Sequence, residues 1–305
     1  MRPQVSIVIP AYQEGENILV CLHRILREVT LPCEVLVVHD TPDDSTVPYV
    51  EKINREDPRV RAVLNTYGRG PANAIRFGID AAGAPVAVVT MADGSDDPRQ
   101  IDELARLVDR GVVVAAASRY MPGGQQVGGP RIKRTMSRWA GRTLRWFARV
   151  GTRDATNSFK AYSTDFVRSV GIESRSGFEI GLELTAKAAR MRLPVAEIPT
   201  IWLDRQLGDS RFDVARWVPK YLRWYWFAFG RRLTAEQIRA GADGRAAGDE
   251  PAEDVSTGKA EKKAEKKAEK KADGPAPVRD VGGQGPPTSG QVEPDPEQLG
   301  PAATA

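Results

Sequence analysis

Short apolar runs alternate with helix-spaced segments over residues 5–117, and this alternation restricts the chain to few folds. The runs are rich in Val and Ile without an alternating polar face, which is typical of strands buried on both faces. Alternation with short connections predicts an α/β domain on a mostly parallel sheet. The expected strands are Val5–Ile9, Val35–Val38, Val60–Leu64, Val86–Met91 and Val112–Ala117, and the expected helices are Asn17–Val29, Val47–Asn54, Pro71–Ala82 and Ile101–Val108.

The composition changes beyond about residue 233. The remaining residues are mostly Ala, Gly, Pro, Glu, Lys and Asp, and none of them is aromatic. The repeat Ala-Glu-Lys-Lys occurs three times from Ala260 to Lys271 and has no apolar stripe to bury. We therefore expect one folded domain over residues 1–233 and a disordered low-complexity tail over residues 234–305.

Polar residues follow the expected strands. Ligands of open parallel sheets bind beyond the carboxyl ends of the strands, so these residues should converge at one edge. A nucleotide site is the natural interpretation, whereas a dinucleotide Rossmann site is excluded because no G-x-G-x-x-G follows the first strand. The converging residues are Tyr12, Glu14, Asp40, Gly68, Arg69, Asp93, Ser118 and Arg119.

Charge and cysteine usage bear on the partners and the compartment. The formal net charge of +4 is too small to indicate nucleic acid. Cys21 and Cys33 do not form a zinc pattern with His23 and His39, and a disulfide framework is improbable, so a reducing cytosol is expected. No signal peptide is expected at the start of the chain, and its longest apolar stretches fall far short of the roughly 20 residues that span a bilayer. The protein is expected to be soluble or to lie on a membrane.

Two segments suggest a membrane surface. Residues 131–150 are expected to form an amphipathic helix with tryptophans, and seven basic residues but no acid lie between Arg131 and Arg149. Residues 212–230 are dense in aromatic side chains, which suit a headgroup region. The alternative is a helix hairpin packed on the core, or a dimer interface.

Seven segments occur in one order: VSIVIPAYQEGENI, VVHDTPDDST, GRGPANAIRFGIDAA, MADGSDDP, ASRYMPGG, DATNSFKAY and DRQLGDSR. Together they resemble glycosyltransferase family 2, in its dolichol-phosphate mannose synthase-like branch, over about residues 4–230. The resemblance implies a GT-A fold that binds a GDP- or UDP-hexose and Mg²⁺ or Mn²⁺. It also implies transfer of mannose or glucose to a polyprenyl or dolichyl phosphate, with inversion, at the cytoplasmic inner face of a membrane.

The resemblance assigns a donor-binding set. Tyr12 and Glu14 follow the first strand, where an aromatic ring and a carboxylate suit a base and a ribose; Glu14 could instead cap a helix. Asp40 matches a base-contacting Asp, but a family Asp just before it is His39 here, so the base preference is open. The full set is Pro10, Tyr12, Glu14, Asp40, Gly68, Ala92 and Asp93.

The family's metal-binding Asp-x-Asp run reads Met91-Ala92-Asp93 in this chain. Asp93 is the expected ligand, since Mg²⁺ is often held by one or two carboxylates together with water and substrate phosphates. Asp96 and Asp97 could assist, although an acid before Pro98 more often caps a helix.

A phosphate acceptor needs no general base, because its second pKa is about 6, whereas a hydroxyl acceptor does. Arg119 matches an arginine that stabilises the leaving diphosphate. The residues expected in catalysis are Asp93, Arg119 and Arg205, and those expected at the acceptor phosphate are Arg131, Lys133, Arg134, Ser137, Arg205, Ser210 and Arg211.

Five further residues match family positions: Asp154, Thr156, Asn157, Phe159 and Glu183. Asp154 and Glu183 could orient arginines or the sugar, or could be structural partners. Two other functions stay open at this point. One is a soluble family 2 enzyme with a hydroxyl acceptor and Asp204 or Glu183 as base. The other is a nucleotide-sugar-binding protein in which Met91 reports lost catalysis.

Overall fold

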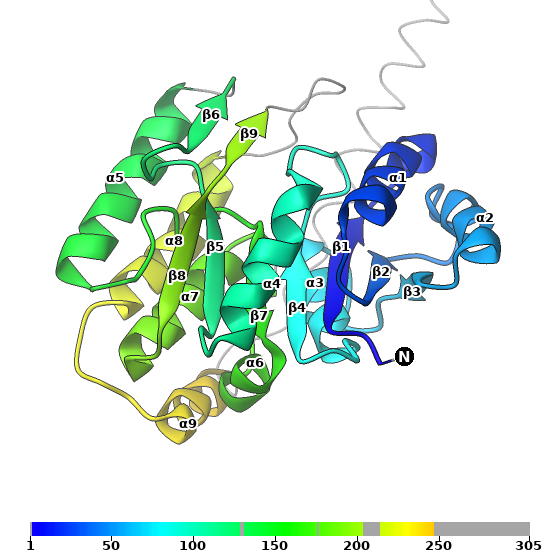
Figure 1. The fold of residues 1–305 in the computed structure, drawn as a ribbon. Helices are drawn as coiled ribbons and strands as arrows, with labels where there is room; N and C mark the ends of the chain where they lie inside the picture. Colours follow the sequence, from blue (N-terminus) through cyan, green and yellow to red (C-terminus); the bar gives the residue numbers. More distant parts are fainter. Residues whose placement is uncertain (1, 129–130, 176, 204–213, 247–305) are drawn as a thin grey trace, which may run out of the picture. The chain divides into compact units, whose positions relative to one another are not determined.

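The computed structural model describes residues 2–128, 131–175, 177–203 and 214–246. A seven-stranded sheet runs through it in the order β3-β2-β1-β4-β7-β5-β8 (Figure 1). Strand β7 is antiparallel to β4 and β5, and the other neighbours are parallel, so the expected mostly parallel sheet is confirmed. The strands are β1 Val5–Ala11, β2 Cys33–His39, β3 Val60–Leu64, β4 Val86–Val89, β5 Val114–Ser118, β7 Lys160–Ser163 and β8 Val195–Pro199.

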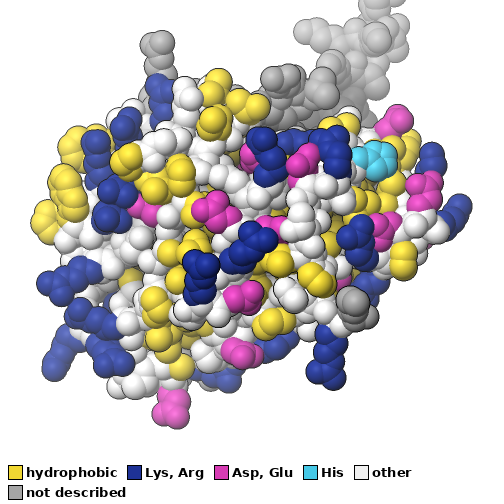
Figure 2. All heavy atoms as spheres, in the orientation of Figure 1, with side chains coloured by type: hydrophobic (Ala, Val, Ile, Leu, Met, Phe, Trp, Pro, Cys, Tyr) yellow, Lys and Arg dark blue, Asp and Glu magenta, His cyan; other side chains and the backbone are white. Residues whose placement is uncertain are grey.

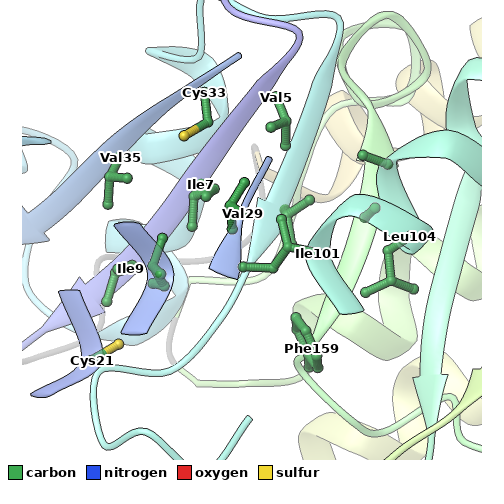
Figure 3. Close-up of a cluster of buried hydrophobic side chains, with 14 of the residues drawn as sticks. Val5, Ile7, Ile9, Cys21, Val29, Cys33, Val35, Ile101, Leu104 and Phe159 are labelled. Carbon is green, nitrogen blue, oxygen red and sulfur yellow. The ribbon is translucent and has the colours of Figure 1, made fainter. Parts of the chain in front are cut away.

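Helices cover both faces of this sheet. Along β1, Ile7 and Ile9 pack into one apolar cluster and Val8 into another, because successive side chains point to opposite faces. The first cluster includes residues from α1 Ile18–Glu28, α2 Val47–Glu56 and α4 Ile101–Asp109. Figure 3 shows the α1 and α4 residues Cys21, Ile101 and Leu104 of this cluster. The second includes residues from α3 Pro71–Asp80, α6 Thr164–Val170 and α7 Ile180–Met191. Cys21 and Cys33 are buried free thiols in the first cluster.

The expected strands and helices of residues 5–117 are present with small shifts at their ends. Strand β1 does not stop at Pro10, which pairs in register with Val38. Short 3-10 turns at Gly15–Asn17 and Pro98–Gln100 precede α1 and α4.

A third cluster joins three helices in the C-terminal half. It contains Leu144 of α5 Arg131–Phe147, Leu182 of α7 and Trp224 of α8 Val214–Phe227. Gly141 lets α5 approach the Arg153 carbonyl, where a Cβ would have no room. Strands β6 Gln125–Val127 and β9 Ile201–Leu203 form a separate parallel pair. Among the described helices, none has both the length and the apolar character needed to cross a bilayer.

The folded unit continues past the boundary expected at residue 233. Helix α9 Ala235–Ala246 places Ile238 in the second apolar cluster, with 1% of its surface exposed. The Arg239 guanidinium donates to the Arg168 carbonyl of α6. The sequence concealed this helix because Ile238 is one buried apolar residue in a polar, Ala- and Gly-containing segment. Residues 247–305 of the expected tail lie outside the described part.

Candidate active site

The loop after β1 is held by a residue that the sequence analysis did not single out. Asp44 is buried and accepts hydrogen bonds from the Gln13 and Thr46 backbone N–H groups at 3.0 and 2.8 Å. Thr46 Oγ1 accepts from the Glu14 N–H at 3.0 Å. These bonds support Gln13 in a left-handed conformation, with φ of 53°, and leave Tyr12 55% exposed. These bonds fix the conformation of the loop that was predicted to bind the donor. The turn-forming Asp43-Asp44-Ser45-Thr46 run was the sequence signal for this support.

Asp40 ties the end of β2 to the turn after β3. Its Oδ1 accepts from Asn65 Nδ2 and its Oδ2 from the Gly70 N–H, both at 2.8 Å. Asn65 Nδ2 also donates to the Gly68 carbonyl at 2.6 Å. Gly68 and Gly70 have φ angles of 99° and 112°, which favour glycine. Asp40 and Gly68 thus meet at one edge of the sheet, where they were predicted to contact the donor.

The segment after β4 brings two carboxylates together. Asp96 is buried, and its Oδ2 accepts from Thr90 Oγ1 at 3.0 Å and from the Met91 N–H at 3.1 Å. Burial raises the pKa of Asp96 to about 6, and the nearby Asp93 charge adds to the rise. Asp93 is half-buried and accepts from the Ser95 N–H at 3.0 Å. Asp96 therefore secures the loop that carries Ala92 and Asp93.

Asp97 caps a helical turn, which was one of the two roles expected for it. Its side chain accepts from the Arg99 N–H at the start of the 3-10 turn before α4. The same carboxylate pairs with the exposed Arg99 guanidinium at 2.7 Å.

The carboxylates after β4 fit a metal that brings most of its ligands with it. Within the described ranges, no three His, Cys, Asp or Glu side chains are grouped so as to hold an ion by themselves. Asp93 and Asp96 repel each other, however, and a cation beside Asp93 would relieve that repulsion. Mg²⁺ sites commonly combine one or two carboxylates with water and substrate phosphates. The donor set therefore suits a metal bound jointly with a diphosphate.

Arg119, directly after β5, is locked in a buried ion pair. Its Nε and Nη2 donate to the two carboxylate oxygens of Asp154 at 2.7 and 2.9 Å, and its backbone N–H donates at 3.1 Å. The two side chains are 13% and 0% exposed. Burial alone would raise the pKa of Asp154, but the Arg119 guanidinium, together with the Lys160 charge and the Arg119 backbone N–H, holds that pKa below its usual value. Asp154 therefore contacts an arginine, which fits both the arginine-orienting and the structural interpretation left open for it.

A hydroxyl pair connects Arg119 to α5. Arg119 Nη2 approaches Thr156 Oγ1 at 3.5 Å, and Thr156 Oγ1 lies 2.5 Å from Ser137 Oγ. Arg134, one turn earlier on α5, is half-buried. The structure thus places Ser137 of the predicted acceptor set beside Arg119. The side chains of Arg131 and Lys133, and the residues Arg205, Ser210 and Arg211, lie outside what the structure describes.

Lys160 is a further buried basic residue that the sequence analysis did not single out. Its Nζ donates to the carbonyls of Ala155, at 3.1 Å, and of Asn157. Burial lowers the pKa of Lys160 to about 7, although the Asp154 charge opposes the shift. By these bonds Lys160 holds the loop that presents Thr156 to Arg119. Lysine side chains are usually exposed, so nothing in the sequence indicated a buried supporting role for Lys160.

Replacing Lys160 with methionine is expected to change how stability depends on pH. A lysine whose folded-state pKa is depressed from 10.5 to about 7 contributes stability that is present above 10.5 and lost as the pH falls through about 7. The wild type should therefore gain stability over Lys160→Met between pH 7 and 9, by at most about 1.4 kcal/mol per pH unit. Denaturant unfolding at both pH values measures this difference. Parallel pH profiles would contradict a buried, neutralised Lys160.

Glu183 does not serve as the general base considered for a hydroxyl acceptor. The Glu183 side chain is fully buried. Its Oε1 accepts from the Glu173 N–H at 2.7 Å and from Lys187 Nζ at 2.6 Å. Its Oε2 accepts from the Ser174 N–H at 2.9 Å. A carboxylate with both oxygens occupied and no exposed surface cannot receive a proton from a substrate. Glu183 is a structural partner that fastens α7 to the preceding loop. The other candidate base, Asp204, lies outside the described residues.

Comparison with known proteins places the site in context. Residues 6–171 match the family described as Glycosyl transferase family 2. An undecaprenyl-phosphate mannosyltransferase of Micrococcus luteus is 30% identical over 231 residues, which cover 72% of this chain and 93% of that protein. A polyprenol monophosphomannose synthase of Mycolicibacterium smegmatis is 29% identical over 71% of this chain and 88% of its own length.

Solved structures share the fold at low identity. A mannosyltransferase of Pyrobaculum calidifontis in complex with GDP-Man and Mn²⁺ has a TM-score of 0.53 and 17% identity, covering 89% of this chain and 80% of that one. Glucosyl-3-phosphoglycerate synthase of Mycobacterium tuberculosis, in complex with Mn²⁺, UDP and glucosyl-3-phosphoglycerate, has a TM-score of 0.55 and 16% identity, covering 76% of this chain and 82% of that one. At such identities the likeness concerns the arrangement of strands and helices.

Proposed function

Because the chain belongs to glycosyltransferase family 2 and is a glycosyltransferase with a GT-A fold, we propose that it moves a hexosyl group from a nucleotide sugar to a polyprenyl phosphate. Mannose from GDP-mannose is the first expectation, with glucose from a UDP-sugar as the second. The named activities of the Micrococcus and Mycolicibacterium relatives support the acceptor class.

One observation carries the proposal. Arg119 lies near enough to Asp96 to affect its pKa, and on its other side it is linked through Thr156 to Ser137 of α5. This arrangement supports one site shared by the carboxylates suited to a metal diphosphate and the start of a basic helix. The groups described at the α5 side are hydroxyls and guanidinium groups, which bind phosphate well. This set suits an acceptor that arrives as an anion.

The proposed reaction is a single displacement at the anomeric carbon. An acceptor phosphate oxygen bonds to that carbon while the bond to the donor diphosphate breaks, and the bond's electron pair leaves with the diphosphate. No proton has to move, because a phosphate monoester is largely ionised at neutral pH. Arg119, held rigid by Asp154, is positioned to stabilise anionic oxygens with little reorganisation. A bound divalent metal would neutralise charge on the diphosphate, with Asp93 as its protein ligand.

We further propose that the protein works as a peripheral enzyme on the cytoplasmic face of a membrane. Helices α5 and α8 pack together, and the Tyr225 hydroxyl donates to Thr143 Oγ1 at 2.9 Å. Beside this contact both helices leave large apolar side chains exposed, which supports an interfacial role. They are Met136, Trp139, Trp146, Phe147, Leu222 and Trp226.

A donor screen tests the proposed function. Purified protein would be incubated with Mg²⁺ or Mn²⁺, a short polyprenyl phosphate, and radiolabelled GDP-mannose, UDP-glucose, UDP-galactose or UDP-N-acetylglucosamine. The expected result is an organic-extractable labelled lipid from one donor. Label transferred to water-soluble hydroxyl acceptors alone would favour a soluble enzyme, and donor binding without turnover would favour a binding protein.

A further inference from the structure

A groove of about 440 Å³ lies against α5, and one of its lining residues, Tyr120, contacts Ser137 of the predicted acceptor set. The turn after β5 forms one wall of the groove. The middle and end of α5, together with Arg153, form the other. Four of its eight lining residues are arginines, which is an unusual concentration of one charge in a single hollow. The lining residues are Tyr120, Met121, Pro122, Arg138, Arg142, Arg145, Trp146 and Arg153.

The positive charge of this groove is only partly neutralised. Glu197 of β8 pairs with Arg145 at 3.3 Å and with Arg153 at 2.5 Å, and its side chain is 7% exposed. Arg138 and Arg142 are exposed and form no ion pair with any residue that the structure describes. Within the described part of the chain, the groove therefore contains four guanidinium groups but only one carboxylate paired with them, that of Glu197, which holds Arg145 and Arg153 in place. A groove with that excess is complementary to a phosphate group.

The neighbouring surface of α5 indicates what carries that phosphate. Trp139 and Trp146 are seven residues apart and therefore share one side of the helix, next to the row of Arg138 and Arg142. Trp139, Trp146 and Phe147 are 60%, 69% and 72% exposed. Figure 2 shows basic and apolar side chains side by side over α5, at the left of the view. A phosphate attached to an apolar body fits both parts of this surface.

We propose that this groove binds the phosphate of an anionic phospholipid headgroup and so seats α5 on an acidic bilayer. Arg138 and Arg142 contact the headgroup, while Trp139, Trp146 and Phe147 enter the interface beside it. The groove adjoins the predicted acceptor site, since Tyr120 contacts Ser137, but its exposed arginines, Arg138 and Arg142, do not belong to the acceptor set. The inference rests on the proposed function, because it names the lipid class that holds the enzyme at its membrane.

Vesicle binding by the full chain tests the proposal. Vesicles of phosphatidylcholine alone are compared with vesicles that contain phosphatidylcholine and phosphatidylglycerol at 7:3, by co-sedimentation at low salt. The wild type is expected to prefer the anionic vesicles. The variant Arg138→Gln/Arg142→Gln is expected to lose about 30-fold in affinity for them, while its affinity for neutral vesicles is unchanged. Both replaced side chains are exposed, so the thermal melting curve should match that of the wild type.

The matched control removes the same charge elsewhere. Lys52→Gln/Arg55→Gln changes two exposed residues of α2, which packs beside β3 at the other edge of the sheet, and should keep the anionic preference. An equal loss in the control, or no loss in the groove variant, would overturn the proposal.

Transfer to a short, water-soluble polyprenyl phosphate without vesicles separates the two sites. Arg138→Gln/Arg142→Gln should keep the wild-type KM for that acceptor; a raised KM would assign the groove to the acceptor and overturn the lipid proposal. Failure of the proposed function would look different. It would leave the wild type without transfer to any polyprenyl phosphate while the groove-dependent vesicle preference persisted.

Discussion

Replacing Asp93 with alanine is expected to lower kcat/KM for sugar transfer by about 100-fold or more, with little change in stability. Asp93 is the described carboxylate best suited to a metal held jointly with a diphosphate, since Asp96 is buried and occupied by Thr90 and Met91. Losing the charge compensation of a leaving diphosphate removes about 3 kcal/mol or more of transition-state stabilisation. Initial rates with the donor found in the screen measure this loss.

The control for Asp93→Ala is Asp97→Ala, four residues further along the same segment. Asp97 caps the turn before α4 and pairs with an exposed arginine, so its loss should change kcat/KM by less than about threefold. Mn²⁺ binding in the presence of the nucleotide gives a second readout, which should weaken in Asp93→Ala and hold in Asp97→Ala. Equal activity of both variants would show that Asp93 does not serve the metal.

Local sequence patterns predicted most of the parallel part of the fold. Buried runs such as Val35–Val38 must form strands because no polar face interrupts them, and the helices between them carry one apolar stripe. Strand β7 was missed because its sequence Lys160-Ala-Tyr-Ser has neither pattern. Its place between β4 and β5 depends on antiparallel pairing across long stretches of chain, which no local period reveals.

The positions of candidate site residues could be predicted where those residues follow the ends of strands. Asp40, Asp93 and Arg119 could be placed at one edge because they lie in the segments that follow β2, β4 and β5. Their partners could not be found that way. Asp154 is 35 residues from Arg119, and Lys160 becomes a support only once the loop after Asp154 folds over it. Such pairings depend on which loops meet in space.

Replacing Asp154 with asparagine is expected to destabilise the protein by about 3–5 kcal/mol and to abolish transfer. Asparagine has nearly the same shape, but it leaves Arg119 as a buried charge without its counterion. It also replaces a carboxylate that accepts from the Arg119 and Asn157 backbone N–H groups and orders the Thr156 turn. Denaturant unfolding measures the loss, and Asp57→Asn in the exposed Asp57–Arg59 pair should cost less than about 1 kcal/mol.

A double variant separates the structural role of this ion pair from its catalytic role. Arg119→Met/Asp154→Leu removes both charges together, so stability should recover to within about 2 kcal/mol of the wild type, as for other buried pairs replaced by apolar residues. Transfer should stay abolished, because the guanidinium that approaches Thr156 and is positioned to bind anionic oxygens has been removed. Recovery of transfer together with stability would show that Arg119 and Asp154 only hold the loops in place, and would remove Arg119 from the proposed mechanism.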